Sequence, residues 1–359
     1  MSGDDTMAPT RAARGENGAD AARGVAFAAV ATTAPLRRGS RVPAAAAGYV
    51  AMGVLAASVG ALADAYTTVT LSRVLAVGLL AVSVAVLTGW AGLPSLGQIA
   101  PFAIGAYTAA LLSRAGVTVG VVQLAAAAGT AAAFAAVTGL VVVRTRGTTF
   151  LMVTLAVGEL TATAAGRWRG LTGGSDGLAG IPAVRPIWAA PALTDDRHVY
   201  WYVLAVTAAV VACTVAVLRS PAGLLLTGVR DHETRMRACG HPVGAYLLAA
   251  YAAAGAIAGV GGALLVTVAR YISPADVGFD VAALVLLAVI LGGAASVGGA
   301  FAGAALIVAT RDWLAGPWPG HAPLLVGGML IAAVYLLPDG LAGLAGRLRQ
   351  WAARMAVRS

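Results

Sequence analysis

Long apolar runs, separated by short polar segments, dominate the chain from residue 44 onward. A helix that crosses the hydrocarbon core of a bilayer needs about 20 predominantly apolar residues, so each such run predicts one crossing. The run 281–310 is too long for one crossing and divides at the glycines of Gly292–Gly299. The pattern predicts an all-α, polytopic integral membrane protein of about 10 transmembrane helices. The predicted spans are 44–63, 71–89, 99–112, 117–143, 148–165, 200–218, 245–269, the two halves of 281–310, and 323–337.

One apolar stretch, Leu87–Ala110, is interrupted at its centre by Gly89, Gly92, Pro94 and Gly97. Glycine and proline leave backbone groups unpaired in lipid, which is tolerated only where protein or a water-lined cavity covers them. The interruption predicts either a discontinuous, re-entrant-like helix beside a substrate path, as transporters build, or a plain turn between two helices at the membrane surface.

A second stretch, 289–306, repeats this order of features. Each stretch has an apolar helix, a break rich in glycine and serine, and a returning helix of small residues. Related halves of this kind are common in transporters, although two tight turns that converged would look the same. We therefore expect a loose internal repeat.

The polar segments divide the chain into three parts. Residues 1–43 are polar and rich in arginine, and we expect them to form a disordered cytoplasmic tail rather than a signal peptide. Residues 44–341 form the predicted transmembrane domain, and 342–359 form a basic cytoplasmic tail. Within the membrane domain, 219–244 is a charged cytoplasmic loop.

Composition supports the membrane assignment and excludes several other classes of protein. The chain is 59% hydrophobic and only 11% charged, with a mean hydropathy of +0.84, whereas soluble domains carry about 25% charged residues. All 24 basic residues are arginine, so a nucleotide-binding P-loop, which requires lysine, is absent. The arginines fall between apolar runs rather than in a patch with aromatics, which argues against nucleic-acid binding. Two cysteines, Cys213 and Cys239, suggest no disulfide framework.

Arginine placement predicts the orientation. With ten crossings and the N-terminus inside, 16 of the 24 arginines fall on the cytoplasmic side and 8 outside, as the positive-inside rule requires. Both termini are then cytoplasmic. The break of Leu87–Ala110 also lies on the cytoplasmic side, which favours Ser95, Gly97 and Gln98 as residues of an inner gate or pathway lining.

Few residues inside the predicted spans could take part in catalysis, metal binding or proton transfer. The four histidines lie in loops without metal-ligand spacing, and no intramembrane acid or histidine cluster resembles a proton relay. Glu159 is the one carboxylate well inside a predicted span. An intramembrane acid is costly and indicates a functional site by default. Its alternative is a structural acid that bonds to a neighbouring threonine or to the backbone, or one close enough to the outer interface to be hydrated.

The loop 219–244 mixes helix-forming residues with charged ones, and Gly240 and Pro242 end the pattern. A short, charged cytoplasmic helix of this kind is either a solvated connector or a lever that docks into a groove of a soluble partner.

Four motifs in order resemble the membrane-spanning permease subunit of branched-chain amino acid ABC transporters, over roughly Leu71–Leu341. They are G-W-A-G-L-P-S-L-G-Q at 89–98, T-T-F-L-M-V-T-L-A-V-G-E-L at 148–160, L-T-G-G-S-D-G-L-A-G-I-P at 171–182, and S-P-A-G with V-R-D-H-E-T-R-M-R-A-C-G-H-P-V-G-A-Y across 220–246. The last motif continues through I-S-P at 272–274 and L-G-G-A-A-S-V-G-G at 291–299.

The resemblance implies roles for individual residues. The segment 230–240 resembles the family's ATPase-coupling segment, through Arg230, Asp231, Glu233, Ala238 and Gly240. The translocation pathway would include Ser95, Gly97, Gln98, Glu159, Ser175 and Asp176.

The chain also departs from the family's pattern. Arg235, Met236 and Arg237 are more basic than the family's coupling segment, and Ile99 and Pro101 replace a glycine and a small residue. These last two changes bear on solute selectivity.

The resemblance implies a transport subunit with no catalytic residues, metal or cofactor of its own. Its partners would be two ATP-binding subunits, a second homologous permease and an extracytoplasmic solute-binding protein in the bacterial cytoplasmic membrane. Importers of urea or short amides share this architecture. A secondary transporter or channel that works without ATP is a second class of function, which the missing ion-relay cluster disfavours. A membrane-embedded enzyme would need paired catalytic groups, and none is visible.

Overall fold

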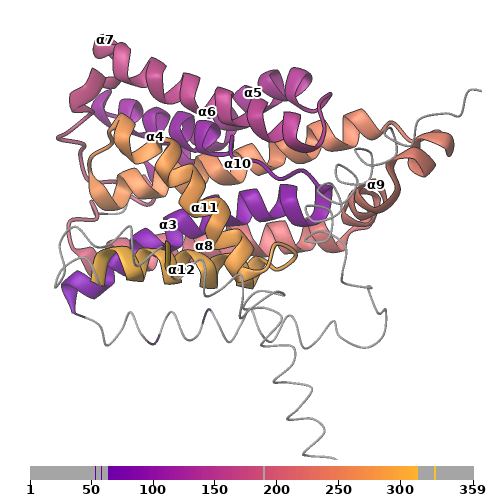
Figure 1. The fold of residues 1–359 in the computed structure, drawn as a ribbon. Helices are drawn as coiled ribbons and strands as arrows, with labels where there is room; N and C mark the ends of the chain where they lie inside the picture. The colour runs from indigo at the N-terminus through magenta and orange to yellow at the C-terminus, as the bar shows by residue number, and fades with distance from the viewer. Residues whose placement is uncertain (1–52, 54–57, 59–63, 189–190, 314–326, 329–359) are drawn as a thin grey trace, which may run out of the picture. The chain divides into compact units, whose positions relative to one another are not determined.

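The computed structural model describes residues 53, 58, 64–188, 191–313 and 327–328. Helices make up the architecture of this part, and strand pairing is limited to two isolated bridges, so the all-α prediction is confirmed (Figure 1). The elements are α3 (Ala65–Ala85), the π-helical turn η2 (Val86–Ala91), α4 (Ile99–Arg114), α5 (Gly120–Val142), α6 (Gly147–Arg167), α7 (Arg169–Thr172), η3 (Gly174–Asp176), α8 (Asp196–Arg219), α9 (Pro221–Ala238), α10 (Val243–Ala269), η4 (Pro274–Val277), α11 (Phe279–Gly292) and α12 (Val297–Trp313).

Eight of the predicted spans coincide with helices in this part of the chain, and the split of 281–310 appears as the turn between α11 and α12. Among the described residues, six helices are long and apolar enough to cross a membrane, while α12 is a shorter apolar helix. The prediction of about 10 crossings is therefore not confirmed. The predicted spans 44–63 and 323–337 and both tails lie largely or wholly outside the described residues.

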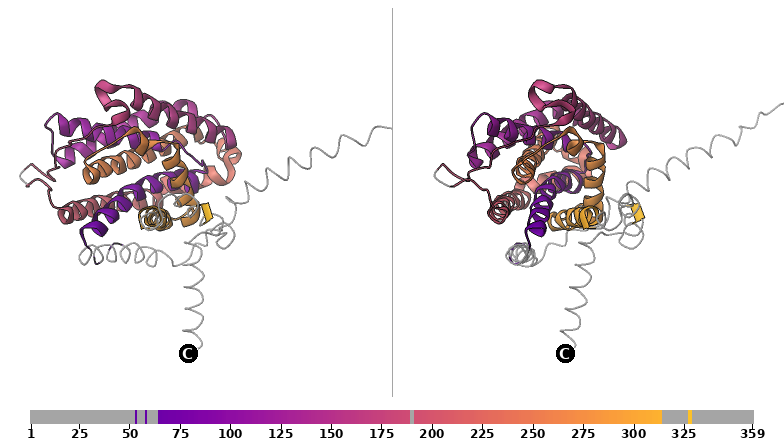
Figure 2. Two further views of the ribbon diagram at one scale, coloured as in Figure 1. Left: turned by 60° about the vertical axis from the view of Figure 1, so that its left-hand side comes forward. Right: turned by 90° about the vertical axis from the view of Figure 1, so that its left-hand side faces the viewer.

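Helices α3 and α10 form the core of the bundle. Both are apolar on every side, which is the composition of a helix surrounded by other helices. Helix α3 packs against α8, α10, α11 and α12, and α10 packs against α3, α4 and α5. Figure 1 shows α3 and α10 running lengthwise through the bundle, with α11 crossing it obliquely, and Figure 2 shows the same bundle from two other sides. By contrast, most of α6 and α8 is not covered by this chain.

Small residues bring α5 and α10 into close contact. Ala127, Ala131 and Ala135 recur every four residues along α5 and are fully buried. They face Gly255 and Gly259 of α10, where an added Cβ would lie 2.4 Å from the Cβ atoms of Ala135 and Ala131 respectively. Close backbone approach at small residues is the usual way in which helices associate in lipid, since lipid offers no hydrophobic driving force between them.

The bundle has two ends that differ in character. One, the α9 end, holds α9, the α5–α6 turn (143–146), the break 92–98 and the α11–α12 turn (293–296). The other, the α7 end, holds α7, η3 and η4, and a bridge between Leu178 and Ile272 ties its loops together. Figure 1 shows α9 on the right and α7 at the upper left.

We expect Gly259→Ala to lower the free energy of unfolding by about 1–3 kcal/mol, the usual range for overpacking a close contact. The new methyl group would meet Ala131 and also the Ala127 carbonyl oxygen, at 2.7 Å. The matched control is Gly129→Ala on α5, where the added methyl meets nothing within 4 Å. Thermal unfolding in detergent measures the melting temperature of each purified variant. Equal melting temperatures for the two variants would contradict this packing.

Candidate coupling and transport site

The interruption of the long apolar stretch takes the form of a π-helical turn followed by an irregular segment. Helix α3 widens into η2 at Val86, and Gly92 then adopts the left-handed conformation with a φ of 70°. Helix α4 starts only at Ile99. The intervening Ser95, Gly97 and Gln98 are buried. The break is therefore covered by protein, and π-helical turns of this kind occur frequently at functional sites.

Two neighbouring elements cover the break. A Cβ on Gly97 would lie 2.7 Å from the carbonyl oxygen of Thr154 in α6, so this glycine is required for the contact. A Cβ on Gly89 would lie 2.1 Å from the carbonyl oxygen of Ala294, in the α11–α12 turn. The two glycine-rich breaks that share an order of features in the sequence thus pack directly against each other. Whether they descend from one repeat stays a prediction.

Arg230 of α9 lies against the same break. Its Nη1 donates a hydrogen bond to the carbonyl oxygen of Gly89, and its Nε donates to Asp231 at 2.9 Å. Its Cγ fills the space beside Gly92, 2.7 Å from where a Cβ would be. Only 22% of the side chain is exposed. A guanidinium group therefore satisfies a carbonyl that the end of a helix would otherwise leave unpaired.

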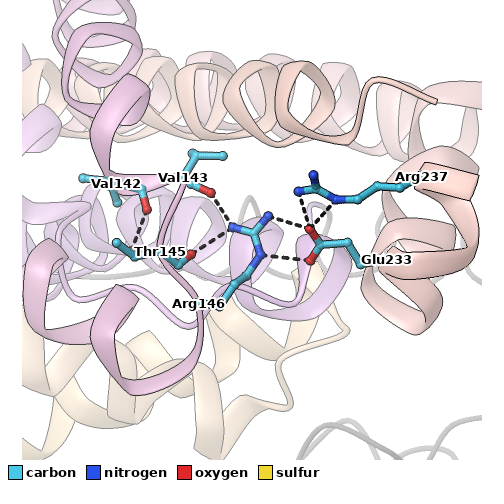
Figure 3. A network of polar contacts seen from close by, with 6 residues as sticks. All are labelled: Val142, Val143, Thr145, Arg146, Glu233 and Arg237. Atoms are coloured by element: carbon cyan, nitrogen blue, oxygen red, sulfur yellow. Dashed lines mark hydrogen bonds and ion pairs between the residues drawn. The ribbon is translucent and has the colours of Figure 1, made fainter. Parts of the chain in front are cut away.

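Glu233 attaches α9 to the α5–α6 turn (Figure 3). Its carboxylate accepts two hydrogen bonds from Arg146, each 2.9 Å long, and two from Arg237 one helical turn further on. Arg146 in turn donates to the carbonyl oxygens of Val143 and Thr145, which fixes its guanidinium group. The hydrogen bonds from Arg146 are the main reason that the pKa of Glu233 falls from 4.5 to about 2.

The residues assigned to coupling divide into two groups. Arg230 and Glu233 bond to other parts of this chain, whereas Asp231, Ala238 and Gly240 are exposed. Helix α9 ends at Ala238, and Gly240 has a φ of 80°, as expected for the residue that ends it. The predicted helix in 219–244 is thus present, with one side attached and another open.

The residues assigned to the pathway do not come together. Ser95, Gly97 and Gln98 lie at the α9 end, beside the start of α6, while Ser175 and Asp176 are exposed on η3 at the α7 end. Gly97 lies beside Thr154, and the 13 residues of α6 from there to Arg167 separate the two groups by about 20 Å. Glu159 lies between them on the exposed side of α6.

Two features were not identified from the sequence. In the sequence Arg146 indicates only the orientation, because its bidentate contact with Glu233 joins residues 87 positions apart. The side-chain amide of Gln98 is fully buried, and both its polar atoms lack a hydrogen-bond partner among the described residues. Within the same part of the chain, no cluster of histidine, cysteine or acidic residues could hold a metal ion.

The described part of the chain combines apolar helices of membrane length with a break that protein covers and a charged helix attached beside that break. These features define a multi-pass membrane protein of the permease class. The chain belongs to the family of the branched-chain amino acid transport system / permease component, whose sequence model matches residues 66–334.

Two curated relatives share the name "High-affinity branched-chain amino acid transport system permease protein LivM". The protein of Escherichia coli (strain K12) is 29% identical over 278 residues, and that of Salmonella typhimurium (strain LT2) is 28% identical over 282 residues. Each alignment covers 71% of this chain but only 65% of the relative's length. No solved structure matches the chain significantly.

Glu233→Gln should loosen α9 at neutral pH. A partly exposed ion pair contributes about 1 kcal/mol, so we expect the α9 amides to exchange hydrogen about fivefold faster. Because the folded-state pKa is depressed, this stabilisation is complete above about pH 4.5 and is lost as the pH falls toward 2. Hydrogen exchange by mass spectrometry at pH 7 measures it.

Asp231→Asn makes the same change in charge two residues away on α9 and serves as the control. Its carboxylate contacts only the neighbouring Arg230 among the described residues, so exchange in α9 should change less than twofold. Equal acceleration in both variants would contradict a specific attachment through Arg146.

Proposed function

We propose that this chain is the membrane-spanning permease subunit of an ABC importer that translocates branched-chain amino acids across the bacterial cytoplasmic membrane. The observation that carries the proposal is α9, a charged helix between the membrane helices α8 and α10, attached to the break on one side and open on the other. Family membership and the printed names of the two relatives supply the solute class.

The energy source lies in other chains. Without lysine this chain cannot form a P-loop, so two separate ATP-binding subunits hydrolyse ATP. A second, homologous permease completes the membrane part, and an extracytoplasmic solute-binding protein delivers the amino acid. The chain itself is a transport subunit and not an enzyme.

Helix α9 connects the ATPases to the membrane part. Its exposed residues Asp231, Ala238 and Gly240 face the ATP-binding subunits at the cytoplasmic side. Arg230 transmits their movement to the Gly89 carbonyl at the end of α3, and the pair Glu233–Arg146 transmits it to the start of α6. The two halves of α9, on either side of the kink at His232, thereby each contact one membrane element.

The break forms the inner gate of the pathway. Gly97 holds it closely against Thr154 of α6, and the unpaired amide of Gln98 supplies the donor and acceptor that a passing polar solute or water needs. Ser175 and Asp176 lie at the entrance on the opposite face. Glu159 points away from this chain's core on α6. A charged group is costly against lipid, so this side of α6 faces the second permease.

Other solutes and other energy sources remain testable alternatives. Import of urea or short amides would use the same architecture and would appear as competition in an uptake assay. A secondary transporter or channel would transport without the ATP-binding subunits. Uptake by this chain alone in proteoliposomes, driven by an ion gradient, would favour that class and exclude the present proposal.

Charge reversal at Asp231→Arg should weaken co-purification of the ATP-binding subunits at least about tenfold, corresponding to about 1.4 kcal/mol at an interface position. Uptake should fall in parallel. Asp280→Arg makes the same change at an exposed acid on α11, at the α7 end, and should leave both unchanged. If ATPase association and uptake survive in the Asp231 variant, α9 is not the contact surface.

Gly97→Leu should abolish uptake while the ATP-binding subunits still co-purify. The larger side chain cannot fit beside Thr154, so the gate segment is held out of position. Gly129→Leu, on an open side of α5, should transport normally. Normal uptake by the Gly97 variant would show that the break is a plain turn and not a gate.

A further inference from the structure

Helices α3, α10, α11 and α12, together with η4, line a cavity of about 300 Å³ that opens to the surface, in the half of the bundle nearer the α7 end. The volume is at the lower end of the range of small-molecule sites, which is about 300–1,000 Å³. It is separate from the break and from α9, and neither the family assignment nor the residues discussed above give it a role.

One wall of the cavity consists of branched aliphatic side chains. They come from three of the surrounding helices, α3, α11 and α12, and include Val77, Val281, Leu284, Val285, Ile307 and Val308. Such a surface favours an apolar group of similar shape by excluding water from it. The cavity therefore suits the side chain of a small aliphatic ligand.

Three charged side chains line the same cavity: Arg73, Arg311 and Asp276. Arg73 lies about two turns inside α3. Charged residues inside membrane-spanning segments are costly and by default mark a functional site. The Arg311 guanidinium group and the Asp276 carboxylate give the cavity donors for an anionic group and an acceptor for a cationic one.

Asp276 is held in a defined position. Its Oδ2 accepts hydrogen bonds from the backbone N–H of Ser273 at 3.0 Å and from the Ser273 hydroxyl at 2.9 Å, a capping box at the start of η4. For Oδ1, no partner is recorded in the described part of the chain. One carboxylate oxygen is thus anchored and the other is available to a ligand.

A second hollow lies next to the cavity. A space of about 330 Å³ is lined by Arg73 and Arg311 together with Tyr66, Val69 and Thr70 near the start of α3. Both arginines line both spaces.

We propose that this cavity binds an α-amino acid with a branched aliphatic side chain, through Arg311 to its carboxylate, Asp276 to its ammonium group and the aliphatic wall to its side chain. The choice of ligand rests on the proposed function, while the site rests on the cavity. An anionic lipid would satisfy Arg311, but its phosphate would be repelled by Asp276. The charge pattern therefore favours a zwitterion.

Direct binding of radiolabelled L-leucine tests the site, with the assembled transporter in nanodiscs, without nucleotide and without the solute-binding protein. We expect saturable binding that leucine displaces. Three analogues test the three parts of the site. Leucinol lacks the carboxylate and 4-methylpentanoate lacks the amine, so each should compete at least about tenfold less well because a charged group of the site loses its partner. Glycine lacks the side chain and should also compete at least about tenfold less well, because it leaves the aliphatic wall uncovered.

Arg311→Gln and Asp276→Asn should each weaken leucine binding at least about tenfold. Arg114→Gln changes an exposed arginine at the same end that does not line the cavity, and should bind normally. Ser273→Ala removes the hydroxyl of the capping box but keeps the Asp276 charge, so it separates loss of charge from loss of η4 structure. Ala269→Phe, at an exposed position on the cavity wall, should abolish binding by filling the space.

The outcomes separate this inference from the proposed function. Leucine uptake driven by ATP without any saturable binding in the nanodisc assay overturns the site alone, as does binding that Arg311→Gln and Asp276→Asn leave unchanged. Displacement of leucine by phosphatidylglycerol, with no discrimination among the amino acid analogues, would identify a lipid site instead. Binding with the expected variant effects, but no ATP-driven uptake, supports the site and overturns the proposed function.

Discussion

The hydrogen bond from Arg230 to the carbonyl oxygen of Gly89 is the contact on which the α9 end of the structure depends. A break in a membrane helix exposes backbone groups that lipid cannot satisfy, so other protein must cover them. Here the cover comes from a charged helix outside the apolar core and from the α11–α12 turn, which packs on the same glycine. The backbone requirement of the break thereby attaches α9 to the membrane helices at a defined point.

A second attachment joins α9 to another part of the membrane domain, so α9 contacts two membrane elements and not one. Glu233 and Arg146 join it to the turn before α6 with bidentate geometry, which restrains orientation as well as distance. The two attachments lie on either side of a kink in α9 at His232, whose φ of -148° and ψ of 72° are not helical, so each half of α9 has its own contact with the membrane helices. The proposed cavity lies in the other half of the bundle, between helices that also contact α3. Helix α3 is thus common to the contacts of α9 and to the proposed solute site.

Much of the fold could be predicted because apolar run length and glycine placement are local properties. The sequence alone located most helices, the break and the end of α9 near Gly240. It could not pair Arg146 with Glu233 or Gly89 with Ala294, because these contacts join distant segments and depend on how the helices pack. Nor could it show that Arg230 points into the protein while Asp231, its neighbour, is exposed. The cavity is likewise a product of packing, since its charged residues come from α3, η4 and α12.

The central claim is that Arg230 links α9 to the break. The most direct test is the number of ATP molecules hydrolysed per amino acid imported in proteoliposomes. For Arg230→Met the account predicts full ATPase association and near-normal hydrolysis, but uptake reduced at least about tenfold, so the ratio rises by the same factor. Arg235→Met, at an exposed position on α9, should keep the normal ratio. An unchanged ratio for Arg230→Met, or loss of the ATP-binding subunits from that variant, would contradict an internal link and make Arg230 at most an ATPase contact.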